Sequence, residues 1–359
     1  MPRFVILTEG HSEPERAKTA TALLRYRPED VAAILDSERA GETAEEVFGV
    51  GGAIPVVGRL SEAKADALLI GIAPAGGALP PEWRKTVREA IRRGLDVVSG
   101  LHAFLSEDPE FRRLAAQHEV RLVDLRRPPE RLTVSADLAR RTRCHRVHTV
   151  GHDCSVGKMV AAVEIARALE RRGKRAEFVA TGQTGILLAG WGVPVDRIVS
   201  DFVAGAIETA ILERQDREFL VIEGQGSLVH PFYSGVTLSL LHGCAPQTLV
   251  MVFDPTRKAI RHTDRPMPPL SEVVRIYEEM ASVVEPSRVV AVAANTYKLS
   301  ADEARAAVRR AEEELGIPAA DVIRDGPERI VEAVLERHEE LGLGRPARPP
   351  RRAARPARR

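Results

Sequence analysis

The middle of the chain contains a segment whose residue types suit phosphate binding. Residues 151–159 read Gly-His-Asp-Cys-Ser-Val-Gly-Lys-Met, after an apolar run at 146–150 and before a helical pattern at 159–172. Consecutive backbone N–H groups at a helix N-terminus, with a lysine, create a site for an anion. We therefore interpret the segment as a phosphate-binding loop, with contacts to the ligand from Gly151, Asp153, Cys154, Ser155, Val156, Gly157, Lys158 and Met159.

The loop departs from the common motif in two ways. In G-x-x-x-x-G-K-[ST] the glycines are five residues apart and a hydroxyl group follows the lysine to bind Mg²⁺. Here Gly151 and Gly157 are six apart, and Met159 occupies the hydroxyl position. Lys158 can still hold a phosphate, but the usual metal ligand is missing.

Carboxylates elsewhere could hold a metal instead. Glu223 directly follows the apolar run 219–222, and Asp153 and Asp201 are further candidates. Mg²⁺ prefers oxygen ligands and borrows several from water and phosphate. We expect Mg²⁺ at Glu223 with Asp153 or Asp201, unless Met159 indicates metal-free binding, in which case these carboxylates serve another purpose.

Polar residues near the ends of expected strands are candidates for substrate binding and catalysis. His230, Tyr233 and His242 follow Glu223 in a segment that we expect to be a substrate loop, and Asn295 ends an apolar run and could contact an adenine. The catalytic candidates are Lys158, Glu223, His230 as a general base, and Thr181. The substrate-binding candidates are Thr181, Gly182, Gln183, Thr184, Gln225, Gly226 and Ser227.

The rest of the sequence predicts the elements that position these residues. In the first part, short apolar runs alternate with helical patterns, which is typical of a parallel sheet covered by helices. The expected strands there are 3–7, 31–35, 54–57, 67–72, 95–98 and 120–123, and the expected helices are 13–26, 61–64, 81–93 and 109–118.

A second series of the same kind follows a proline- and arginine-rich stretch. Its expected strands are 146–150, 176–180, 219–222, 248–253, 288–293 and 321–324, and its helices are 159–172, 203–214, 270–280, 301–315 and 327–341. We predict an α/β protein with a Rossmann-like N-terminal domain at 1–125, a linker at 126–145, a P-loop NTPase-like domain at 146–344 and a disordered Arg/Pro tail at 345–359.

Composition narrows the class of protein. No apolar run approaches the roughly 18 residues of a membrane span, and the start of the chain does not resemble a signal peptide, so we expect a cytoplasmic protein.

The tail holds seven arginines and no acid, which leaves the body with a net charge of −6. We interpret the tail as solvated and do not expect nucleic-acid binding. A homo-oligomer is expected for a metabolic enzyme.

The motifs resemble those of known families. The loop is similar to the G-T-D-T-x-V-G-K-T loop of dethiobiotin synthetase, and Glu223-Gly224-Gln225-Gly226 is similar to that enzyme's metal-binding E-G-A-G segment. Over residues 1–340 the chain resembles the D-glutamate N-acetyltransferase family, formerly two-domain P-loop proteins of unknown function. The runs that carry this resemblance include 34–41, 71–77, 98–102, 153–159, 180–185, 200–205 and 222–227.

The resemblance implies transfer of acetyl from acetyl-CoA to the amino group of D-glutamate or a related acidic amino acid. The phosphate loop would then hold acetyl-CoA, with a base at His230, His242 or Glu223 and oxyanion donors in the Thr181–Thr184 segment. The alternative is an ATP-dependent ligase that acts through an acyl-phosphate, as dethiobiotin synthetase does. The third hypothesis is a nucleotide-binding regulator without enzymatic activity.

Overall fold

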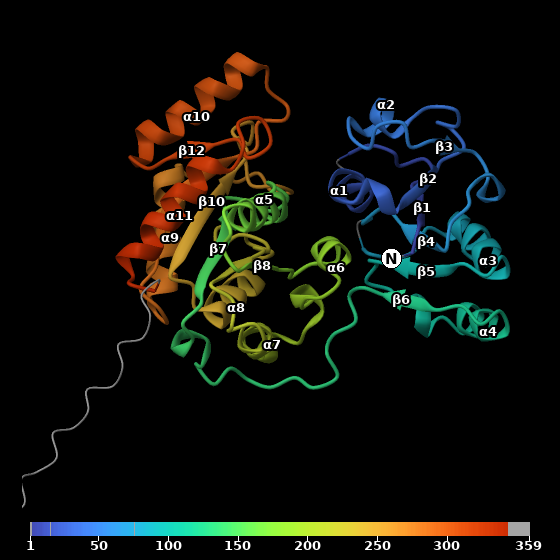
Figure 1. Ribbon diagram of the computed structural model, residues 1–359, viewed down its shortest axis with the longest axis horizontal. Coiled ribbons are helices and arrows are strands. Elements are labelled where there is room, and N and C mark those ends of the chain that lie inside the picture. Colours follow the sequence, from blue (N-terminus) through green and yellow to red (C-terminus); the bar gives the residue numbers. More distant parts are fainter. Residues whose placement is uncertain (1, 15, 75, 344–359) are drawn as a thin grey trace, which may run out of the picture.

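The computed structural model describes residues 2–14, 16–74 and 76–343, which form two α/β units, each built on a six-stranded sheet (Figure 1). Every pairing between neighbouring strands in both sheets is parallel. The predicted fold class is therefore confirmed. No helix in the described ranges is long and apolar enough to cross a membrane.

The N-terminal sheet has the strand order β3-β2-β1-β4-β5-β6. Its strands are β1 (Phe4–Leu7), β2 (Val31–Leu35), β3 (Val56–Val57), β4 (Ala67–Ile70), β5 (Asp96–Ser99) and β6 (Leu122–Asp124). The helices of this unit are α1 (Lys18–Tyr26), α2 (Ala44–Phe48), α3 (Arg84–Arg92) and α4 (Pro109–Gln117). The apolar side chains of β1 and β4 are fully buried, since helices cover both faces of a sheet of this kind.

The C-terminal sheet has the strand order β12-β11-β10-β7-β9-β8, with β7 and β9 adjacent near its centre. Its strands are β7 (His145–Gly151), β8 (Ala176–Val179), β9 (Phe219–Ile222), β10 (Thr248–Phe253), β11 (Arg288–Ala294) and β12 (Ala319–Ala320). Its helices are α5 (Lys158–Arg171), α6 (Gln183–Ala189), α7 (Ser200–Glu213), α8 (Ser234–Cys244), α9 (Leu270–Ser282), α10 (Ala301–Leu315) and α11 (Glu328–Glu340). Because β7 and β9 run parallel as neighbours, the loops that follow them emerge at the same edge of the sheet.

The expected strand at 321–324 is wrong. The edge strand β12 lies just before it, and residues 321–324 form a turn. The Asp321 carboxylate accepts hydrogen bonds from the N–H groups of Ile323, Arg324 and Thr296 at 2.9 to 3.1 Å. A side chain that bonds its own backbone in this way favours a turn over a strand.

Three helices were not predicted from the sequence. Helix α2 is short, while α6 and α8 begin in segments rich in Gly, Ser and Thr, which resemble loops by composition. Both α6 and α8 bury one side against neighbouring elements: Leu187 of α6 and Leu240 of α8 are buried. Tertiary packing therefore stabilises these helices despite weak local propensity.

Helix α6 joins the two units (Figure 1). Its Leu187 packs in the hydrophobic core of the N-terminal unit, and its carbonyl accepts a hydrogen bond from Arg27 at 3.0 Å. The Thr184 hydroxyl lies 3.0 Å from the Thr19 hydroxyl at the start of α1. Gly100, which follows β5, contacts the side chain of Gln183 so closely that a Cβ atom at position 100 would lie 2.7 Å from it. A helix of the P-loop unit is thus part of the N-terminal core.

Hydrogen bonds to the Glu208 carboxylate of α7 hold the stretch between β6 and β7 against this helix. Glu208 is 4% exposed and accepts hydrogen bonds from the backbone N–H groups of Ala136 at 2.7 Å and Ala139 at 3.2 Å, and also from Leu138. Gly205, one turn earlier, lets this stretch approach the helix, because a Cβ atom there would overlap the Thr133 carbonyl. The expected tail at 345–359 lies outside the described residues.

Glu208→Ala should destabilise the protein by about 1 to 3 kcal/mol, because it removes the acceptor of three backbone N–H groups, of which that of Ala139 is buried. Chemical denaturation followed by circular dichroism measures this change. Glu213→Ala, on an exposed position of the same helix, is the matched control and should change the midpoint little. Equal midpoints for the two variants would contradict the assigned role of Glu208.

Candidate functional site: a P-loop beside a buried carboxylate

The loop after β7 turns sharply into α5. Gly157 immediately precedes the helix with φ +107°, and Ser155 has φ +56° at the exposed tip of the loop. A side chain at position 157 would be strained in this left-handed conformation, which explains the glycine. The amide of Asn295, at the end of β11, donates a hydrogen bond to the Val156 carbonyl at 3.0 Å. Asn295 therefore positions the loop, a role that the sequence did not indicate.

Lys158, the first residue of α5, is buried against this loop. Its Nζ donates a hydrogen bond to the Asp153 carbonyl oxygen at 2.8 Å, and the residue is 6% exposed. Burial lowers the pKa of Lys158 to about 8. Two glycines make room for the side chain: a Cβ atom at Gly151 would lie 3.0 Å from Nζ, and one at Gly224 would lie 2.9 Å from Cδ.

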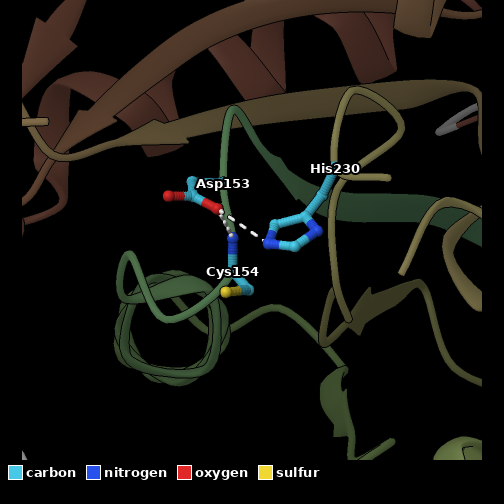
Figure 2. Close-up of side chains that lie close together, drawn as sticks. All are labelled: Asp153, Cys154 and His230. Atoms are coloured by element: carbon cyan, nitrogen blue, oxygen red, sulfur yellow. Dashed lines mark hydrogen bonds and ion pairs between the residues drawn. The ribbon is translucent and has the colours of Figure 1, made fainter. Parts of the chain in front are cut away.

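Asp153 shapes the loop from inside and is fully buried. Its Oδ1 accepts a hydrogen bond from the Cys154 N–H at 2.7 Å, and its Oδ2 accepts one from the Arg261 N–H at 3.0 Å. Figure 2 shows Asp153, Cys154 and His230 close together, and one ligand atom of each lies within 4.8 Å of the others. The half-buried Cys154 thiol has a raised pKa, chiefly because of burial.

Glu223 follows β9 directly, and its carboxyl group is buried. Its Oε2 accepts hydrogen bonds from the N–H groups of Thr181 at 2.9 Å and Gly182 at 3.2 Å. Burial raises the pKa of Glu223 to about 7. Gly185 permits this arrangement, since a Cβ atom there would lie 2.3 Å from Oε2. A carboxyl group with this pKa can hold or release a proton near neutral pH.

The expected oxyanion donors at 181–184 lie where β8 leads into α6, which begins at Gln183. The Thr181 hydroxyl donates to the Glu223 carbonyl oxygen at 2.8 Å and accepts a hydrogen bond from Gln225 at 3.1 Å. Gln183 and Thr184 face the N-terminal unit, as described above. The Thr181 and Thr184 hydroxyls and the N–H groups of Thr181 and Gly182 therefore already have hydrogen-bond partners within the protein.

His230 does not have a free nitrogen for the role of general base. Its Nε2 lies 3.0 Å from the Arg261 carbonyl oxygen and must donate to it, while Nδ1 accepts from the Phe232 N–H at 3.2 Å. His242, on α8, directs Nε2 to the Met280 carbonyl at 2.9 Å. Tyr233 is 39% exposed and packs on the His230 ring with a centroid distance of 4.5 Å. The assignment of His230 as the base stays a prediction, and it would require His230 to give up one of these two hydrogen bonds.

Two further substrate candidates have structural contacts. Ser227 is fully buried and its Oγ accepts a hydrogen bond from the Val229 N–H at 3.4 Å. Gly226 adopts φ +56°, and a Cβ atom there would lie 2.5 Å from the Thr237 hydroxyl. Both residues shape the turn between β9 and α8.

The expected metal ligands occupy different elements. Asp201 is exposed in the first turn of α7. Within the described ranges, Asp153, Cys154 and His230 form a cluster of three possible ligands, to which neither Glu223 nor Asp201 belongs. The pairing of Glu223 with Asp153 or Asp201 around Mg²⁺ stays a prediction.

Two arginines near the loop were missed. Arg257 and Arg261 follow β10, and Nη1 of Arg257 lies 3.7 Å from the Asp153 Oδ2 atom. The sequence feature that could have identified them is the basic run 257–265, which directly follows β10, a neighbour of β7 in the sheet. Its position at the carboxyl edge of the sheet is the usual place for a ligand contact.

Comparisons with known proteins agree with this organisation. Two relatives named D-glutamate N-acetyltransferase are similar to the chain. The relative from Tritonibacter scottomollicae is 39% identical over 280 residues, 77% of this chain and 84% of that protein. The relative from a Pseudoalteromonas species is 35% identical over 271 residues, 74% of this chain and 80% of that protein.

A solved structure matches nearly the whole chain. The crystal structure of a DUF1611 family protein from Anabaena variabilis superposes with a TM-score of 0.90 at 37% identity, over 94% of this chain and 100% of that one. The models of the two domains of unknown function in this family match residues 37–128, described as Rossmann-like, and 133–331, described as a P-loop domain. The resemblance found in the sequence is confirmed: the chain belongs to the DUF1611 family, together with proteins named D-glutamate N-acetyltransferase.

Proposed function

We propose that the protein is an N-acetyltransferase that moves acetyl from acetyl-CoA to the amino group of an acidic amino acid, with D-glutamate as the first candidate. The observation that carries the proposal is the buried Glu223 carboxyl group beside the P-loop lysine, in a chain whose relatives are named for this activity. In this proposal Lys158 holds a phosphate of the acetyl donor, and Glu223 accepts a proton from the amine.

The proposed reaction needs one base and no covalent enzyme intermediate. The uncharged amine nitrogen attacks the acetyl carbonyl carbon, the carbon–sulfur bond of the thioester breaks, and CoA leaves as a thiol after the Glu223 carboxyl group returns to its sulfur the proton taken from the amine. Glu223 takes the proton that the amine loses. Its pKa of about 7 suits this role, because the carboxylate form is present near neutral pH and is basic enough to accept a proton.

The hydrogen bonds on Glu223 support the same role. The N–H groups of Thr181 and Gly182 fix the direction of the carboxylate and favour its charged form, while burial favours the neutral form and outweighs them. Within the site, Glu223 is thus both well oriented and able to titrate. The engaged nitrogens of His230 leave Glu223 as the better base.

The ligase alternative has weaker support. An acyl-phosphate mechanism would use Mg²⁺ on the γ-phosphate of ATP, and the hydroxyl that usually follows the P-loop lysine is replaced by Met159. Acetyl transfer from a thioester does not require a metal-binding hydroxyl group in the loop. We therefore rank the acetyltransferase first.

Lys158→Ala should lower kcat/KM for acetyl-CoA by about 10- to 100-fold, since a charge-assisted bond to phosphate is lost. Release of free CoA thiol in the presence of D-glutamate measures the rate. Lys174→Ala is the matched control, because Lys174 pairs with Glu218 at 3.1 Å near the amino edge of the sheet. No thiol release by the unmodified protein, together with ADP formation from ATP and D-glutamate, would replace this proposal with the ligase.

The value of kcat/KM for acetyl-CoA should show a bell-shaped dependence on pH, because it reports the titrating groups of the free enzyme. It should rise as Glu223 loses its proton at about pH 7 and fall as Lys158 loses its charge above about pH 8. Glu223→Gln keeps a hydrogen-bond acceptor of the same size but cannot take a proton, so kcat should fall by about 100- to 10,000-fold. A Glu223→Gln variant that retains the full rate with the same acid limb would remove Glu223 from the mechanism.

A further inference from the structure

The segment after β10 brings positive charge to the phosphate loop. The backbone of Arg261 holds this segment, residues 254–267, against the loop. The Arg261 N–H donates a hydrogen bond to Asp153 Oδ2 at 3.0 Å, and the Arg261 carbonyl oxygen accepts one from His230 Nε2, also at 3.0 Å. Arg257 lies between two carboxylates, with Nη1 3.7 Å from Asp153 Oδ2 and Nε 3.4 Å from Asp254 Oδ2. The attachment does not depend on the Arg261 side chain.

Three side-chain cations belong to the surroundings of the loop. Arg257 lies near Asp153, and the charges of Lys158 and Arg261 both act on the neighbouring Cys154 thiol. The Asp254 carboxylate, which lies beside Arg257, also accepts hydrogen bonds from the N–H and hydroxyl of Thr256. Half-buried guanidinium groups beside a buried lysine favour a ligand with several negative charges.

The residues present do not fit Mg²⁺. Met159 supplies a thioether where P-loop domains usually place a hydroxyl, and magnesium prefers hard oxygen ligands. Both Asp153 oxygens already accept backbone hydrogen bonds, and Oδ2 also faces a guanidinium. The Glu223 Oε2 atom accepts the N–H groups of Thr181 and Gly182. A cation bound by the Asp153 oxygens would compete with hydrogen bonds that shape the loop, and one bound by Glu223 Oε2 would compete with the N–H groups of Thr181 and Gly182.

We propose that Arg257 and Arg261 take the place of the metal ion, so that the loop binds the polyphosphate of its ligand with three side-chain cations and without a divalent metal. This proposal extends the proposed function, in which the ligand is acetyl-CoA. The pyrophosphate and 3′-phosphate of CoA carry more charge than one lysine can balance. Arginine suits such groups, because its planar fork can donate two parallel hydrogen bonds to one phosphate.

Calorimetric titration of the full-length protein with CoA, and separately with ATP, tests the proposal. For the ligand that binds, the affinity should agree within about twofold between EDTA and excess Mg²⁺. Arg257→Ala and Arg261→Ala should each weaken binding at least about tenfold, as expected for loss of a charged hydrogen bond. Arg265→Ala, an exposed arginine of the same segment, is the matched control and should bind normally.

A lowered melting temperature identifies any alanine variant that folds poorly. In that case Arg257→Gln and Arg261→Gln replace it, because glutamine keeps part of the packing of arginine without its charge. Affinity that falls more than about tenfold in EDTA, or normal affinity in the double variant, would overturn the inference. Metal-independent CoA binding without acetyl transfer would instead reject the proposed function alone. Acetyl transfer by a protein whose CoA binding requires Mg²⁺ would reject only this inference.

Discussion

The burial of one ammonium group constrains much of the P-loop unit. Lys158 is held against the Asp153 carbonyl oxygen at the start of α5, and its lowered pKa indicates that the site compensates its charge incompletely. Gly151 and Gly224 lack side chains where a Cβ atom would meet this lysine. An anionic ligand would restore the missing compensation, as the proposed binding of a phosphate at Lys158 requires.

The second titratable group is linked to the N-terminal unit through α6. Glu223 accepts the N–H groups that precede α6, and the same helix places Leu187 in the N-terminal core and Thr184 against Thr19. A shift of α6 relative to β9 would therefore change the surroundings of the Glu223 carboxyl group. This connection gives the N-terminal unit a physical role in setting the geometry of the site, in addition to any contact with substrate.

The sequence was sufficient for the features that depend on local patterns. Apolar runs between helical patterns predicted both parallel sheets, and the spacing of Gly157 and Lys158 predicted the loop. Features that depend on tertiary contacts were predicted poorly. Helix α6 begins at Gln183, inside the polar stretch 181–184, because Leu187 can be buried in another unit, and both ring nitrogens of His230 are engaged by Arg261 and Phe232. Arg257 and Arg261 were missed because a basic run after a strand is usually a solvated surface, and only the arrangement of β10 beside β7 brings it to the loop.

Proton uptake on ligand binding tests the central claim most directly. Calorimetric titration with acetyl-CoA at pH 8, in two buffers of different ionisation enthalpy, measures it. If the phosphate approaches Lys158, the pKa of that group must rise from about 8, and the protein should take up to about half a proton per chain. The Lys158→Arg variant, which is charged at this pH, should take up none. Heats for the unmodified protein that do not depend on the buffer would show that the ligand does not bind at Lys158, and would contradict the account.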